Sequence, residues 1–120
     1  MSTFHSSWGP VAIWLAGLVG LWGVAMARRD TVPRAFYWAV AAAVSALLAQ
    51  VVAGVALMTT GEIDPGNQHV FYGVLIAATF AFAYIYRPQF RARPGLRYGL
   101  LLLFAMGLAL RGIQTIGVNF

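Results

Sequence analysis

The amino-acid sequence predicts an all-α protein, a four-helix transmembrane bundle with its N-terminus and C-terminus both on the outer side of the membrane. The first observation is composition, because 61% of the 120 residues are hydrophobic and 9% are charged, whereas soluble domains carry about 25% charged residues. A soluble fold of this length cannot bury so much apolar surface. The second is that the apolar residues form four long runs, and the third is that arginines fill the links between them.

The four expected spans are residues 9–27, 35–58, 69–86 and 98–118, which together make one polytopic membrane domain over residues 1–120. Each is close to the roughly 20 residues that cross a bilayer as a helix. No run alternates apolar and polar residues as a barrel strand would. Each of the five prolines lies outside a span or near its end, where a missing N–H costs least.

The arginines predict the orientation of these spans. Seven of the eight basic residues, all arginine, lie in residues 28–34 and 87–97, whereas the link at residues 59–68 holds Glu62 and Asp64 and no arginine. Because arginine-rich links remain in the cytoplasm, we expect the 28–34 and 87–97 loops to be cytoplasmic.

Arginine without lysine, together with abundant alanine and glycine, suggests a bacterial genome and therefore the bacterial inner membrane.

Composition also excludes several classes of function. The chain has no cysteine, so disulfides, thiolate metal sites and cysteine nucleophiles are excluded. The net charge of +5 lies in short links and not on a polar face, so it favours anionic lipid over nucleic acid. No phosphate loop, zinc-protease motif or nucleophile elbow is present. We therefore expect a protein that is not an enzyme.

Polar side chains gather in the outer half of the expected bundle. Arg111 lies well inside the fourth span, Gln50 lies inside the second, and His69 opens the third. An arginine in hydrocarbon costs about 3 kcal/mol by insertion measurements, so it needs a partner or must reach the surface. These residues predict a cofactor-binding site in the outer half, formed by His69, Tyr72, Gly73, Gln50, Arg111 and Gln114.

Small residues recur at intervals of four in two spans, and residues four apart share a helix face. The rows are Ala42, Ala46, Gln50, Gly54 and Met58 in the second span, and His69, Gly73, Ala77 and Ala81 in the third. Such rows let helices approach closely in lipid. The alternative is that the small residues beneath His69 make room for a flat cofactor.

Two interpretations of the polar residues involve either pairing or redox chemistry. In the first, Arg111 forms a structural ion pair with Glu62 or Asp64, and such a buried pair needs no further role. In the second, the site holds haem b or quinone. His69 would be an axial ligand of haem, with His5 as the second, and Arg111 would pair with its propionates. For quinone, histidine, tyrosine, glutamine and arginine side chains are suitable donors to the carbonyl oxygens.

Two further interpretations are a metal site and a transport path. His5, Met58, Asp64 and His69 would suit copper, because imidazole and thioether are copper ligands. Of these four, the two histidines, His69 and His5, are the expected metal ligands. A small ion channel or transporter could be lined by Arg111. A proton-coupled mechanism lacks the carboxylate embedded in a span that it requires.

The run "HVFYG" at residues 69–73, the arginine-rich loop after it, and "GLALRG" at residues 107–112 carry a resemblance. The chain resembles small, largely uncharacterised four-helix bacterial integral membrane proteins over residues 35–112. The resemblance implies that His69, Tyr72, Gly73 and Arg111 form one functional set, and it implies no activity. Haem-bearing anchor subunits of respiratory enzymes are similar in size and span number, but their histidine pattern within helices is not matched.

By elimination, the expected function is a small non-catalytic membrane subunit, an accessory or stabilising component of a larger bioenergetic assembly. Its links are too short for a catalytic domain. The expected partners are the lipid bilayer and other membrane protein subunits or further copies of the chain. Exposed Trp14, Trp22 and Phe82 would meet lipid or another subunit. A haem b- or quinone-binding electron-transport protein is the alternative.

Overall fold

The structure is a computed structural model that describes the backbone of residues 2–60 and 66–116 and the side chains of residues 7–60, 66 and 68–116. These residues fold into four long helices and one short 3-10 helix, with no strand among the residues described. In chain order the elements are α1 (Ser2–Ala25), α2 (Arg34–Thr59), α3 (Asn67–Ile85), η1 (Arg87–Arg91) and α4 (Pro94–Gln114).

All four long helices are long and apolar enough to cross a membrane, which confirms the prediction of an all-α bundle with four candidate spans; the side on which the termini lie stays a prediction. The segments that meet this criterion are Ser7–Ala25, Arg34–Thr59, Gln68–Ile85 and Pro94–Gln114. Large apolar side chains cover the outside of the bundle; Trp14 is 66% exposed and Trp38 is 72% exposed. Such a surface suits hydrocarbon and not water, because a soluble monomer rarely exposes large contiguous apolar patches.

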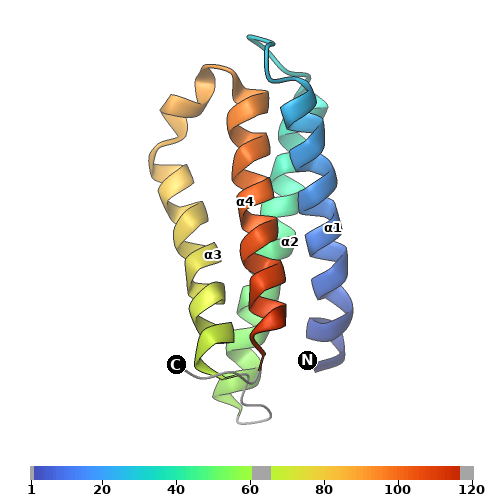
Figure 1. Cartoon of the computed structure of the whole chain (residues 1–120), viewed down its shortest axis with the longest axis vertical. Helices are drawn as coiled ribbons and strands as arrows, with labels where there is room; N and C mark the ends of the chain where they lie inside the picture. The colour runs from blue at the N-terminus through green and yellow to red at the C-terminus, as the bar shows by residue number, and fades with distance from the viewer. Residues whose placement is uncertain (1, 61–65, 117–120) are drawn as a thin grey trace.

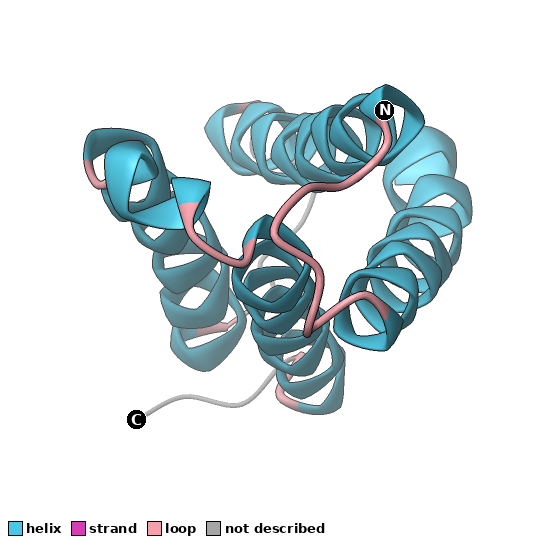
Figure 2. Cartoon of the chain, turned by 90° about the horizontal axis from the view of Figure 1, so that it is seen from above, coloured by secondary structure: helices cyan, strands magenta, loops and turns pink. Residues whose placement is uncertain are grey.

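The helices follow the order α2, α1, α4, α3 around the bundle (Figures 1 and 2). α4 packs along both α1 and α3, α2 packs mainly along α1, and α2 and α3 make little contact. The α1–α2 and α3–α4 links lie at one end of the bundle, which we call the arginine-rich end (residues 26–34 and 86–97). The start of α1, the end of α2, the start of α3 and the end of α4 lie at the other end (Figure 1).

Glycines bring the backbones of α1 and α4 together in the half nearer the arginine-rich end. A Cβ atom added at Gly23 would lie 2.5 Å from the carbonyl oxygen of Gly95 and 2.9 Å from the Cα of Gly99. A Cβ atom added at Gly99 would lie 2.7 Å from the carbonyl oxygen of Gly20. Because lipid offers no hydrophobic drive for helices to associate, such close approach of small residues holds membrane helices together.

The bounds of α1 and α4 differ from the sequence-based expectation. α1 begins at Ser2 and not at residue 9, so Pro10 lies inside the helix. The expectation for this proline was wrong, because membrane helices tolerate proline where neighbouring groups satisfy the freed backbone. α4 begins at Pro94. The ring of proline fixes φ at a value that suits the first turn of a helix. The helix ends at Gln114, where the Thr115 hydroxyl donates to the carbonyl oxygens of Arg111 at 3.0 Å and Gly112 at 3.1 Å.

Candidate functional site

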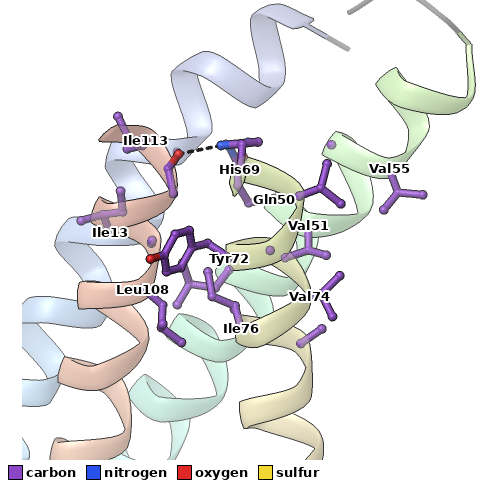
Figure 3. Close-up of a pocket in the computed structure, with 18 of the residues that line it drawn as sticks. Ile13, Gln50, Val51, Val55, His69, Tyr72, Val74, Ile76, Leu108 and Ile113 are labelled. Atoms are coloured by element: carbon purple, nitrogen blue, oxygen red, sulfur yellow. Dashed lines mark hydrogen bonds between the residues drawn. The ribbon is translucent and has the colours of Figure 1, made fainter. Parts of the chain in front are cut away.

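A cavity of about 370 Å³ lies between α2 and α3 in the half of the bundle away from the arginine-rich end. All four helices contribute to its wall, as Figure 3 shows for Ile13 of α1, Val51 of α2, Ile76 of α3 and Leu108 of α4. Its lining is almost entirely apolar. The side chains that bring nitrogen or oxygen to it, among the residues that the structure describes, are Gln50, His69 and Tyr72.

The cavity exists because small residues line helices that do not meet. Gly54 of α2, and Gly73 and Ala77 of α3, all face it. A Cβ atom added at Gly73 would have nothing within 4 Å. Gly54, Gly73 and Ala77 therefore leave space between α2 and α3, and room for a flat cofactor there stays a prediction. Ala42 and Ala81, at the far ends of the rows, are exposed on the surface of the bundle.

His69 joins the first turn of α3 to the last turn of α4. Its Nδ1 lies 2.8 Å from the carbonyl oxygen of Gly112 (Figure 3). Because a carbonyl oxygen can only accept, Nδ1 carries the proton in this contact, and Nε2 is then the acceptor of a neutral ring. Gly112 also packs against α3 at this point, since a Cβ atom there would be in ordinary van der Waals contact, 3.4 Å from the Cβ of Tyr72 and 3.9 Å from Nδ1 of His69.

Gln50 and Tyr72 bring the other polar groups to the cavity. The Gln50 amide extends from α2 toward α1, where a Cβ atom at Gly9 would lie 3.1 Å from its Nε2. The glycine thus leaves the space that the amide occupies. Tyr72 is half-buried, and its ring reaches from α3 toward α4 (Figure 3). Among the described side chains, the polar ones of the cavity therefore come from α2 and α3, and those from α1 and α4 are apolar.

The mouth of the cavity opens sideways. Val55 of α2 and Val74 of α3 both line the cavity, and they are 54% and 59% exposed. Both residues belong to segments apolar enough to cross a membrane. A ligand with an apolar tail could therefore leave the tail between α2 and α3, in the hydrocarbon, while its head lies inside.

A hydrogen bond between α1 and α2 stiffens the wall next to the cavity. Nε1 of Trp8 donates to the carbonyl oxygen of Ala46 at 2.9 Å. Trp8→Phe keeps an aromatic ring and removes this donor, so we expect the free energy of unfolding to fall by about 0.6 kcal/mol, the mean for hydrogen bonds between membrane helices. Reversible unfolding in detergent measures this. Trp14→Phe is the control, because Trp14 is 66% exposed; an equal loss in both variants would contradict the prediction.

Arg111 and Gln114 do not line the cavity. Both are exposed on α4, and Nη1 of Arg111 donates to Oε1 of Gln114 at 3.3 Å. Since α4 ends at Gln114, Arg111 lies in the last turn of the helix and not deep within it. A cation in the last turn interacts favourably with the helix dipole, and its long side chain can reach the membrane surface. The structure thus brings together Gln50, His69, Tyr72 and Gly73 and leaves the other two predicted site residues outside.

Three residues named in the sequence-based interpretations lie outside the described side chains: His5, Glu62 and Asp64. The ion pair of Arg111 with either carboxylate, and the metal site of His5 with His69, therefore stay predictions. Met58 lines the cavity near His69. In the part of the chain that the structure describes, no three histidine, cysteine, aspartate or glutamate residues lie close enough to hold a metal ion together.

The residues of α1 and α4 that line the cavity were not among those predicted from the sequence. Gly9 and Ile13 of α1 and Ala109 and Gly112 of α4 line it. In α4 the spacing of Ala105, Ala109 and Gly112 marks one helix face and could have indicated this role.

No protein-family model matches the chain, and no curated protein and no solved structure shows significant similarity to it.

Proposed function

We propose that the protein is a non-catalytic integral membrane protein that binds a flat apolar molecule of the quinone class in the cavity between α2 and α3. The observation that supports this most strongly is that an apolar cavity with a sideways mouth also carries polar side chains from α2 and α3. Its volume of about 370 Å³ falls within the range of small-molecule sites, about 300–1,000 Å³.

The polar groups suit a quinone head. The Tyr72 hydroxyl and the Gln50 amide are groups that can donate to the carbonyl oxygens of a quinone, and a histidine whose Nδ1 donates to a carbonyl oxygen can accept from a quinol hydroxyl at Nε2. The valine-lined mouth suits an isoprenoid tail. Haem b fits less well. Among the described side chains His69 is the one histidine of the cavity, and Arg111, the expected partner of the propionates, lies outside it.

Titration with a short-chain benzoquinone tests this proposal. The protein in lipid nanodiscs should show a saturable rise in its thermal unfolding midpoint, whereas an alkylbenzene of the same tail length, which lacks the carbonyl groups, should give a smaller rise. Tyr72→Phe should weaken quinone binding about fivefold, since one hydrogen bond contributes about 1 kcal/mol. His69→Phe is the second variant. Equal shifts with both ligands would show simple partition into the bilayer and would overturn the proposal.

The location that we propose follows from the arginines. With the arginine-rich end in the cytoplasm, the cavity lies in the outer leaflet of a bacterial inner membrane, and both chain ends face outward. Cysteine labelling tests this, because the natural chain has no cysteine. A cysteine placed at Ser7 should react with an impermeant reagent in intact cells, and one placed at Ala92 should react only after lysis. The reverse pattern would invert the topology.

A second role, as an accessory subunit of a larger membrane assembly, is supported by the free face of α4. Leu100, Phe104, Gly107, Arg111 and Gln114 are all exposed on it, and a Cβ atom at Gly107 would meet nothing within 4 Å. A small residue on an exposed face suits another helix. We expect cysteine at Gly107 to cross-link in native membranes and cysteine at Trp14 not to do so; a lone monomer for both variants would contradict this role.

A further inference from the structure

A second cavity, of about 170 Å³, lies at the arginine-rich end of the bundle. Three elements line it. α2 contributes Tyr37, η1 contributes Arg87, Phe90 and Arg91, and α4 contributes Tyr98. It shares no residue with the cavity between α2 and α3. Its composition also differs, since two arginines and two tyrosines are among the five described residues that line it.

The segment that carries both arginines is held against α4. Arg97 of α4 donates a hydrogen bond from Nη1 to the carbonyl oxygen of Gln89, in the middle of η1. The backbone N–H of Gln89 donates to the carbonyl oxygen of Tyr86 at 3.0 Å. Arg93 then adopts a left-handed conformation, with φ of 47°, and turns the chain into α4. These contacts fix the position of η1 relative to the end of the bundle.

Aromatic rings form the wall between the three elements. The ring centroids of Phe90 and Tyr98 are 4.7 Å apart, and those of Tyr37 and Tyr98 are 6.0 Å apart in an edge-to-face arrangement. Such contacts are favourable and restrict the rings to defined positions. Tyr98 therefore lies between an aromatic ring of η1 and one of α2, and the phenol groups are positioned before any ligand arrives.

Arg87 is also positioned in advance. Its Nη1 donates to the carbonyl oxygen of Tyr84 at 2.8 Å, and its Cζ lies 4.2 Å from the centroid of the Tyr84 ring. A guanidinium has several N–H donors in a fixed plane, so one bond to a carbonyl leaves others for a ligand. Arginine held in this way loses less side-chain entropy on binding than a mobile lysine would.

The charge around this cavity is strongly positive. Residues 28–34 and 87–97 hold seven arginines and one acidic residue, Asp30, and Asp30 is not among the residues that line the cavity. α2 and α4 both begin at this end, and the N-terminus of a helix carries partial positive charge. The potential inside the cavity therefore favours an anion.

From this geometry we infer that the second cavity binds a phosphate group, with Arg87 and Arg91 as the charged ligands and the hydroxyls of Tyr37 and Tyr98 as further donors. Arginine pairs with phosphate through parallel N–H···O bonds, which are among the stronger hydrogen bonds in proteins. The cavity lies where apolar spans end, which is the level of lipid headgroups. The phosphate can belong to an anionic phospholipid or to free phosphate in the cytoplasm, and the chemistry of recognition is the same.

Native mass spectrometry and thermal unfolding test this inference and identify the source. In nanodiscs that contain phosphatidylglycerol and phosphatidylcholine, the released protein should retain phosphatidylglycerol if the source is lipid. In nanodiscs of phosphatidylcholine alone, inorganic phosphate should raise the unfolding midpoint if the source is free phosphate. In either case Arg87→Gln with Arg91→Gln should weaken binding by at least about tenfold, the loss expected for one charge-assisted hydrogen bond.

The matched control is Arg28→Gln with Arg29→Gln, which removes the same charge at the same end of the bundle but outside the cavity. This control should retain binding. If both pairs lose binding equally, the attraction is diffuse, and the inference is overturned; it is also overturned if neither phosphate source binds. Arg91→Gln alone keeps the test valid if the double variant does not fold, because Arg87 retains its contacts with Tyr84.

Discussion

Replacing Gly23 with alanine is expected to lower the free energy of unfolding by about 1–3 kcal/mol, the usual cost of forcing extra volume into a packed contact. The added methyl group would lie 2.5 Å from the carbonyl oxygen of Gly95. Both nearest neighbours on α4 are backbone atoms, so a rotamer change cannot relieve the clash and α1 must move away from α4. Gly23→Leu should prevent folding altogether. Reversible unfolding in mixed detergent micelles, followed by circular dichroism, measures the alanine variant.

Gly107→Ala is the matched control for this prediction. Gly107 belongs to α4, as Gly95 and Gly99 do, but a Cβ atom there would meet nothing within 4 Å. Alanine favours a helix over glycine by up to about 1 kcal/mol, so the control should be as stable as the natural protein or slightly more stable. A loss of equal size in Gly23→Ala and Gly107→Ala would show that the contact between α1 and α4 is not what the added methyl group disturbs.

Gly73→Phe is expected to abolish quinone binding while the bundle remains folded. Gly73 lines the cavity between α2 and α3, and a Cβ atom there has open space around it. A phenyl ring on this position would occupy the space proposed for the quinone head. We expect the quinone-dependent rise in the unfolding midpoint to disappear, which corresponds to at least about a hundredfold weaker binding, or about 2.7 kcal/mol.

The comparison for this variant is Gly107→Phe, which adds the same ring to a glycine with open surroundings outside the cavity. It should bind quinone as the natural protein does. The unfolding midpoints of both variants without ligand show whether either ring damages the fold. If Gly73→Phe folds and still binds quinone with unchanged affinity, the cavity is not the binding site, and the proposed function fails with it.

Much of the fold was predictable because membrane spans are local features. A helix in lipid must satisfy its backbone within its own segment, so the length and apolarity of each run indicate a span without knowledge of its neighbours. The small residues at intervals of four also indicated which helix faces line the cavity. These residues include Gln50 and Gly54 in α2, and Gly73 and Ala77 in α3.

Other features depend on how helices are arranged and could not be predicted in this way. A glycine permits close approach, but only the relative position of two helices decides whether approach occurs. Gly23 meets α4, whereas Gly73 faces open space. The position of Arg111 depended on where α4 ends. The apolar run of the sequence continues past Gln114, but α4 ends at this residue in the structure.

The most extensive contact of the bundle joins α1 to α4, the first and the last of its helices. A ribosome delivers these helices to the membrane in chain order, since synthesis proceeds from the N-terminus. The glycine face of α1 must therefore reside in lipid, without its proper neighbour, until α4 has been inserted. In a truncated chain that lacks α4, this glycine face of α1 would stay exposed to a membrane protease. In the complete chain, packing of α4 against α1 would cover it.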